Sequence, residues 1–295
     1  MATRRDVGPW WWGGGVTTKG MRSGFVLPGG TAAEQLEQAI AAEEAGWDGV
    51  FVWEAAYGPD AWCLLTAIAA RTRRVRLGTM LTPLPWRRPW KVASQVATLD
   101  QISGGRAILA VGVGAPDTDL PQTGEVTGLR ERAARMDEGI DLIRGLWEGG
   151  RSYRGRYYRY ETGRLDLARM AAPVQERIPI WVVGAWPRPK SMRRVLRCDG
   201  LIPQYQEHRE DGGETPADAR AARDWLIAEG APPTLDVIAE GETPAGDPAA
   251  WSALVTPWAE AGCTWWLETR WALPHDSGER MTQVRIRIAA GPPTA

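Results

Sequence analysis

The sequence predicts a (β/α)8 TIM barrel, an α/β fold. Eight short apolar segments rich in β-branched residues alternate with helical segments along 295 residues, as in parallel strands joined by crossover helices. The length suits one barrel domain. A doubly wound dinucleotide fold is disfavoured, because Gly112-Val113-Gly114 is followed by Ala115-Pro116-Asp117 and lacks the third glycine of a GxGxxG motif.

The first residues are expected to lie outside the barrel. Trp10-Trp11-Trp12 precedes Gly13-Gly14-Gly15 without helical or strand periodicity. We therefore expect residues 1–20 to be a disordered extension, or to reflect a wrongly assigned start upstream of Met21. The barrel domain is expected over residues 21–295.

The strands are expected where short apolar runs occur. These runs are residues 24–27, 49–53, 75–81, 107–113, 178–183, 201–204, 235–240 and 264–268. Each is too short for a helix and is followed by turn residues or by a helix-start signal. If they form a closed barrel, the active site lies where their carboxyl ends meet.

Local signals mark the helices between the strands. Thr31 with Glu34 predicts a capping box, and a second helix is expected over residues 60–71. Pro89 predicts a helix that starts near Arg88 and ends at Ser103-Gly104-Gly105. Further helices are expected over residues 129–147 and after Thr215-Pro216 and Asp247-Pro248. Residues 279–290 are ambiguous, because Val284, Ile286 and Ile288 also alternate like a strand.

Two insertions follow the fourth strand. Residues 116–127 are polar and rich in Pro, Gly and Thr, and their length is typical of a lid rather than of a connection. Residues 151–167 carry four tyrosines and Gly155, a composition that predicts a hairpin.

Composition excludes several classes of protein. The net charge is -1 and 44% of residues are hydrophobic, so a nucleic-acid partner is not expected. No apolar run is long enough to span a membrane, and the first twenty residues lack the pattern of a signal peptide, so we expect a cytoplasmic protein. Three scattered cysteines and two histidines predict neither a metal site nor a histidine-based triad.

The strand-end motifs, taken together, resemble one family. The chain contains Leu77-Gly78-Thr79, Leu81-Thr82-Pro83, Ala97-Thr98-Leu99-Asp100, Ser103-Gly104-Gly105-Arg106 and Val111-Gly112-Val113-Gly114-Ala115. This combination is similar to that of the luciferase-like monooxygenases, which are flavin- and deazaflavin-dependent (β/α)8 oxidoreductases. The resemblance extends from about Met21 to Pro293.

The resemblance implies a planar cofactor, reduced FMN or coenzyme F420, across the barrel mouth. It also implies a non-prolyl cis peptide at the end of the third strand, for which Thr79-Met80 is the matching bond. Residues at strand ends are the expected cofactor contacts, and the glycines among them would let the backbone approach the ligand. The full set is Trp53, Thr79, Met80, Thr82, Gly112, Gly114, Gly184, Ala185, Trp186, Arg188 and Gln204.

The second strand departs from the family pattern. Relatives carry an acidic residue and a histidine there, whereas Trp53-Glu54 is followed here by alanines. If a proton moves during hydride transfer, Glu54, Glu240 or Glu268 is the candidate catalytic group, its pKa raised by burial. Alternatively, these acids pair with arginines such as Arg87, Arg88 or Arg270.

Several functions remain open at this stage. The leading hypothesis is a flavin-dependent (FMN or F420) oxidoreductase or monooxygenase acting on a small organic substrate, with a possible reductase partner and a possible homodimer. The hypothesis that F420 is the cofactor is weakened by a missing lysine. Some F420 enzymes use a lysine on the sixth strand to bind phosphate, whereas residues 204–207 offer no cation before Arg209. The alternatives are a non-catalytic flavin-binding relative and a glycoside hydrolase that uses strand-end carboxylates.

Overall fold

The computed structural model describes residues 20–54, 58–115, 124–161, 163, 172–205, 214–244, 246–271 and 277–293. The predicted N-terminal extension therefore falls outside the described residues, except for Gly20. So do residues 116–123 of the predicted lid and residues 162 and 164–167 of the predicted hairpin segment.

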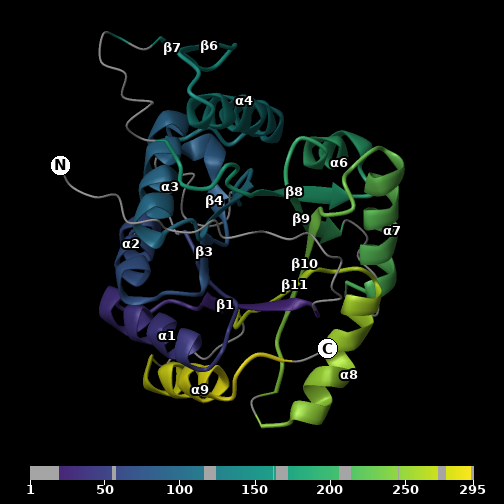
Figure 1. The fold of residues 1–295 in the computed structure, drawn as a ribbon. Coiled ribbons are helices and arrows are strands. Elements are labelled where there is room, and N and C mark those ends of the chain that lie inside the picture. The colour runs from purple at the N-terminus through teal and green to yellow at the C-terminus, as the bar shows by residue number, and fades with distance from the viewer. Residues whose placement is uncertain are drawn as a thin grey trace, which may run out of the picture.

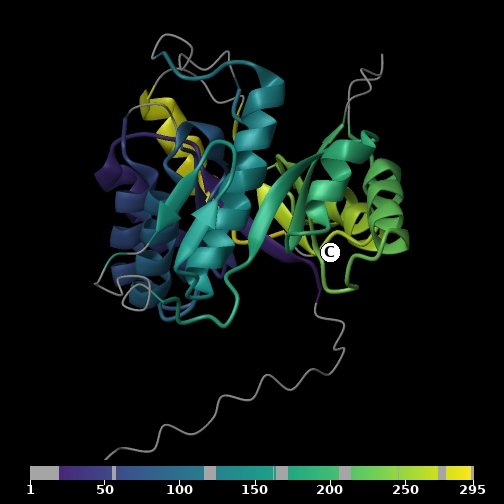
Figure 2. The ribbon, with the colours of Figure 1, turned by 90° about the horizontal axis from the view of Figure 1, so that it is seen from above.

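A closed parallel barrel forms the centre of the molecule (Figures 1 and 2). Its strands are β1 (Arg22–Leu27), β2 (Gly49–Val52), β3 (Arg76–Thr79), β5 (Ala107–Gly112), β8 (Ile180–Trp186), β9 (Gly200–Tyr205), β10 (Asp236–Gly241) and β11 (Trp265–Glu268). The short strand β4 (Thr82–Pro83) follows β3 and also pairs with β5. Pairing of β3 with β5 closes the ring. The predicted fold class is confirmed, and the strand bounds differ from the expected ones by a few residues.

Helices surround the barrel (Figure 2). They are α1 (Ala32–Glu44), α2 (Ala61–Arg71), α3 (Pro89–Ser103), α4 (Leu129–Trp147), α6 (Pro189–Val195), α7 (Pro216–Ala228), α8 (Pro248–Glu260) and α9 (Ser277–Ala289), with the 3-10 turn η1 at Leu84–Trp86. No helix in the described part of the chain is long and apolar enough to cross a membrane.

The predicted helix ends are confirmed where the sequence carried a cap. Thr31 and Glu34 form the capping box of α1, and Arg88 precedes Pro89 at the start of α3. Gly104 ends α3 with a φ of 70°, which favours glycine. The ambiguous C-terminal segment is a helix, because Val284 and Ile288, four residues apart, are both buried.

The predicted hairpin is confirmed in its described part. Strands β6 (Ser152–Arg154) and β7 (Arg159–Glu161) pair antiparallel. The hairpin lies beside α4 at the top of Figure 1. Glu138 of α4 accepts hydrogen bonds from the backbone N–H groups of Tyr157 and Tyr158, which ties the hairpin to that helix.

Large aromatic rings fill the barrel interior. Phe51 stacks on Trp181 with ring centroids 5.3 Å apart, and Trp265 meets both rings edge-on. Glycine on the neighbouring strands makes room for them: a Cβ at Gly200 would lie 2.3 Å from the Trp181 ring. The barrel is therefore filled at this level, and a ligand must bind above it, at the rim.

Candidate active site

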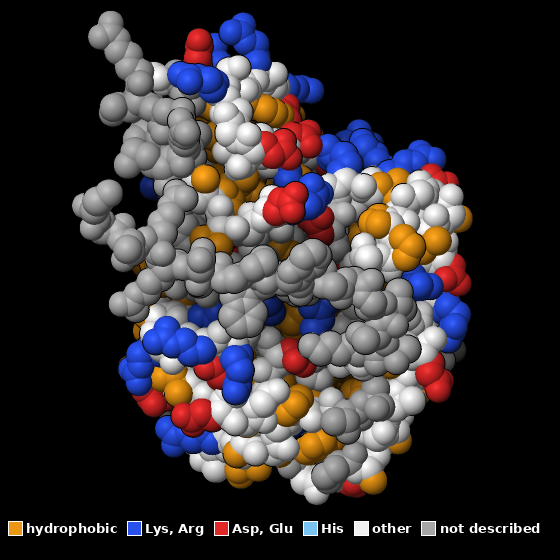
Figure 3. Space-filling model, in the orientation of Figure 1, with side chains coloured by type: hydrophobic (Ala, Val, Ile, Leu, Met, Phe, Trp, Pro, Cys, Tyr) orange, Lys and Arg blue, Asp and Glu red, His pale blue; other side chains and the backbone are white. Residues whose placement is uncertain are grey.

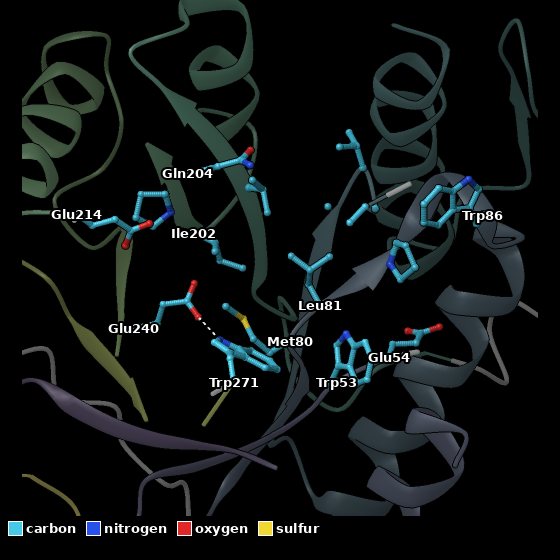
Figure 4. Close-up of a pocket in the computed structure, with 17 residues that line it drawn as sticks. Trp53, Glu54, Met80, Leu81, Trp86, Ile202, Gln204, Glu214, Glu240 and Trp271 are labelled. Atoms are coloured by element: carbon cyan, nitrogen blue, oxygen red, sulfur yellow. Dashed lines mark hydrogen bonds between the residues drawn. The ribbon is translucent and has the colours of Figure 1, made fainter. Parts of the chain in front are cut away.

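A cavity of about 380 Å³ opens at the carboxyl ends of the strands (Figure 4). Its wall combines apolar side chains, three tryptophans, three glutamates and exposed backbone. The apolar and aromatic members include Met80, Leu81, Val183, Ile202, Trp53, Trp86 and Trp271, and the acids are Glu54, Glu214 and Glu240. A concave, mostly apolar site with a few polar groups is typical of small-molecule binding.

Strand alternation decides which residues face this cavity. The interior cluster contains Phe51, Ile202, Ile238 and Leu267, and every second residue along a strand shares its side. Ile202 therefore places Gln204 on the cavity side of β9. By the same alternation Ile238 places Glu240 on the cavity side of β10, and both Gln204 and Glu240 line the cavity.

The structure brings five of the predicted cofactor contacts together. Lining residues include Trp53, Met80, Gly112, Gly114 and Gln204. Their side chains or backbone reach the cavity from the ends of β2, β3, β5 and β9. These residues form the part of the predicted site that the geometry supports.

Two predicted contacts lie behind the wall. The hydroxyls of Thr79 and Thr82 are buried and 2.9 Å apart. Thr82 donates to Oε2 of Glu54 at 2.5 Å. These threonines therefore support a lining residue and do not line the cavity themselves.

Four predicted contacts, at the end of β8 and the start of α6, are not among the residues that line the cavity. A Cβ at Gly184 would meet Leu201 at 2.5 Å and Met192 at 3.0 Å, so this glycine serves packing against α6. The N–H of Ala185 donates to Ser191 Oγ. Trp186 packs against Trp225 of α7, and Arg188 is the N-cap residue of α6.

The predicted cis bond is displaced by one residue. The non-prolyl cis peptide joins Met80 and Leu81, not Thr79 and Met80, and Trp186-Pro187 is also cis. The N–H of Met80 donates to the carbonyl of Val52 at 2.9 Å. The β2–β3 ladder thus extends to Met80, and the chain leaves the regular strand only after this residue.

Glu54 is buried and fully engaged. Its Oε2 accepts from Thr82 and, at 3.2 Å, from Trp62 Nε1, and its Oε1 pairs with Arg87. Burial raises the pKa of Glu54, and the Arg87 charge and the two hydrogen bonds act against that rise. The sequence-based alternative of pairing with a barrel-mouth arginine therefore describes Glu54.

Glu240 faces the cavity and, among the described residues, accepts one long hydrogen bond. Trp271 Nε1 donates to its Oε2 at 3.4 Å (Figure 4). Burial raises the pKa of Glu240, and the Trp271 hydrogen bond opposes this only in part. A carboxyl group with a raised pKa that faces a cavity is a candidate for proton exchange with a bound molecule.

Glu268 does not reach the cavity. It follows the inward-facing Leu267, so alternation turns it outward, where it is completely buried. Its oxygens accept from the N–H and hydroxyl of Thr243 at 2.9 and 2.8 Å. Glu268 also pairs with Arg270 at 2.9 Å and Arg287 at 3.4 Å. The geometry therefore supports a role for Glu268 in joining α9 to the barrel.

Sequence reasoning missed Glu214. This residue directly precedes the Thr215 cap of α7, several residues beyond the end of β9. It lines the cavity on the side of Glu240 (Figure 4). Burial, followed by the charges of Glu240 and Asp218, raises the pKa of Glu214 to about 7. No strand-end pattern could have identified it, and its position before a capping box was the only local signal.

Comparison with known proteins identifies the family. The model of the luciferase-like monooxygenase family matches residues 14–263. The chain belongs to this family, as its motifs predicted.

Individual relatives point in the same direction. The chain is 36% identical over 180 residues to an F420-dependent glucose-6-phosphate dehydrogenase of Nakamurella multipartita, covering 58% of this chain and 51% of that protein. The match thus spans about half the length of this relative.

Solved structures share the fold. Monooxygenase RslO1 from Streptomyces bottropensis superposes with a TM-score of 0.70 at 20% identity, covering 91% of this chain and 98% of that one. An F420-dependent secondary alcohol dehydrogenase superposes with a TM-score of 0.64 at 21% identity, covering 93% of this chain and 92% of that one.

Proposed function

We propose that this protein is an oxidoreductase that uses coenzyme F420 or reduced FMN to transform a small organic molecule. The observation that carries the proposal is an apolar and aromatic cavity at the carboxyl rim of a luciferase-like barrel. The names of the relatives, which include F420-dependent dehydrogenases and a monooxygenase, support the same two chemistries. Membership of this family disfavours the glycoside hydrolase alternative.

The cavity wall fits a planar ring. Met80, Leu81, Val183 and Ile202 offer apolar contacts, and Trp53 offers an aromatic one. A Cβ at Gly112 would lie 2.7 Å from Leu81 and 3.3 Å from Val183. Glycine at this position therefore keeps the apolar wall from being crowded.

When bound, F420 would supply hydride transfer, whereas reduced FMN would supply oxygen activation. Glu240 is the proposed proton carrier, because its carboxyl faces the cavity and the described part of the chain gives it one long hydrogen bond and no ion pair. Glu54 has two hydrogen bonds and an ion pair, so we assign it a supporting role in the wall.

The described lining residues include no cation that could hold the phosphate of a cofactor. The cations that follow β8 belong to the short helix α6, and no residue of α6 is among those that line the cavity. Nε of Arg193 lies 3.7 Å from Oε2 of Glu229. A reductase partner, a homodimer and a cytoplasmic location stay predictions from the sequence.

Titration of the purified protein with F420 and, anaerobically, with reduced FMN tests the proposal. We expect saturable binding of at least one of them, followed by absorbance or fluorescence. Substrate turnover that requires oxygen would indicate the monooxygenase chemistry, and oxygen-independent turnover the dehydrogenase chemistry. If neither cofactor binds, the proposed function is wrong. If a cofactor binds and a broad substrate panel gives no turnover, the non-catalytic relative is correct.

A further inference from the structure

Acids line both sides of the cavity, and the two sides differ in whether a described arginine neutralises them. Glu214 and Glu240 lie together on the side formed by β9 and β10, across from Trp53 and Glu54 (Figure 4). The described residues that line the cavity include no lysine and no arginine. The described wall on this side therefore offers two acidic groups and no basic one.

The arginines that contact the cavity wall are already engaged. Arg87 binds Glu54 and donates to Gln95 at 2.9 Å. Arg132 donates to the carbonyls of Thr127 and Val113 at 3.0 and 2.9 Å. Neither guanidinium is available to neutralise the Glu214–Glu240 side.

Other cations lie on the outer surface. Blue side chains gather at the top of the space-filling view, over the hairpin and α6 (Figure 3). Exposed arginines there include Arg154, Arg156 and Arg159 of the hairpin region and Arg193 of α6. They do not line the cavity.

Among the described residues, the two acids have few polar partners. Glu240 accepts one hydrogen bond there, from Trp271 Nε1 at 3.4 Å. Glu214 has no hydrogen bond or ion pair to any residue that the structure describes. Trp271, which is 53% exposed, adds an aromatic surface beside Glu240. Carboxylates beside an aromatic ring form a favourable environment for an organic ammonium group.

We propose that the substrate is an organic cation whose protonated amine binds between Glu214 and Glu240, next to Trp271. This inference rests on the proposed function and specifies its substrate class. It separates the chain from the relative named as a glucose-6-phosphate dehydrogenase, because a phosphate dianion at this side would be repelled by both carboxylates. Either acid can ionise when the ammonium group arrives and supply its counter-charge.

The pKa of Glu214, about 7, gives the proposal a pH signature. Glu240 of β10 and Asp218 of α7 are the charged groups that act on Glu214. An ammonium ligand binds the ionised carboxylate better, so its affinity should rise as pH increases from 6 to 8. A neutral ligand of the same shape should show no such dependence.

The test compares benzylamine, benzyl alcohol and benzoate by calorimetry on one protein preparation. We expect benzylamine to bind about tenfold or more tightly than benzyl alcohol at pH 8, and benzoate not to bind. Glu214→Gln and Glu240→Gln should each weaken benzylamine binding about fivefold or more without affecting the alcohol. Glu229→Gln, on the exposed end of α7 outside the cavity, is the matched control and should bind like the wild type.

Absence of benzylamine binding, equal affinity for amine and alcohol, or unchanged amine affinity in both cavity variants would overturn the inference. Thermal denaturation of each variant confirms that it is folded. F420 and FMN are titrated into the same preparation. A protein that binds a cofactor without preferring the amine would retain its proposed function and lose only the proposed substrate class.

Discussion

The two acidic sides of the cavity differ in how their carboxylates are held. Glu54 is buried, paired with Arg87 and hydrogen-bonded by Thr82 and Trp62. Glu240, across the cavity, has one weak contact to Trp271. Burial raises the pKa of both carboxyls, so the direction of the shift does not distinguish them. Their partners distinguish them. We therefore propose that Glu54 supports the cavity wall and that Glu240 carries the proton.

Loss of the Arg87 charge beside Glu54 should have the greatest effect on the protein. Arg87→Met leaves the Glu54 carboxylate buried without its counter-charge, which should lower the free energy of unfolding by about 3 kcal/mol. Arg193→Met is the matched control, because the Arg193–Glu229 pair is exposed and should contribute no more than about 0.5 kcal/mol. Urea denaturation measures both. Equal, small losses would show that Glu54 is not held by this pair.

The next effect concerns turnover. Glu240→Gln should lower kcat about 100-fold, the usual contribution of a general acid or base, with little change in stability. Glu54→Gln should lower stability but leave kcat of the folded fraction within about threefold of wild type, since no proton transfer is assigned to Glu54. Steady-state kinetics with saturating cofactor provides the comparison. If Glu54→Gln lowered kcat more than Glu240→Gln, Glu54 and not Glu240 would be the proton carrier.

A smaller effect is the pH dependence of stability at Glu214. Its pKa is raised from 4.5 to about 7 in the folded protein, so the folded state holds a proton that the unfolded state loses. Stability should therefore fall as pH rises from about 4.5 to 7, and the loss should persist above pH 7.

Glu214→Gln removes this ionisation. The variant should gain stability over wild type across that window and equal it below pH 4.5. The side chain of Glu214 keeps contact with solvent, although the atoms around its carboxyl group partly desolvate it, and this contact screens the effect and keeps it small. Thermal midpoints at a series of pH values test it, and a constant difference at all pH values would contradict the assignment.

Removal of the Trp271 hydrogen bond to Glu240 should have the least effect. The Trp271 hydrogen bond lowers the pKa of Glu240, so Trp271→Phe should move the Glu240 ionisation to higher pH. The corresponding limb of the kcat profile should shift in the same direction. A profile that does not move would mean that Glu240 does not control that limb.

The sequence predicted the fold well because its signals were local. The Thr31 capping box, the Thr215 cap with Pro216 and the Gly104 stop fix helix ends within a few residues. Strand alternation, in contrast, has a phase that single apolar runs do not reveal. Gly184 and Glu268 were expected in the site, yet Gly184 packs against α6 and the side chain of Glu268 points away from the cavity.

Glu214 was missed for a different reason. It lies in the connection before α7, and it lines the cavity next to residues that are distant in the sequence. The contacts of Glu54 and Glu240 also come from other segments of the chain. Such contacts depend on the closed barrel and cannot be read from local sequence.

Cofactor titration of a variant with a blocked cavity shows whether F420 or FMN binds at the rim of the barrel. Val183→Trp places a large ring in the apolar wall, whereas Val174→Trp adds the same ring at a residue that is 59% exposed and away from the cavity. We predict that Val183→Trp weakens binding of F420 or reduced FMN about tenfold or more, while Val174→Trp binds like wild type. Equal affinity in the two folded variants would place the cofactor outside this cavity and contradict the account.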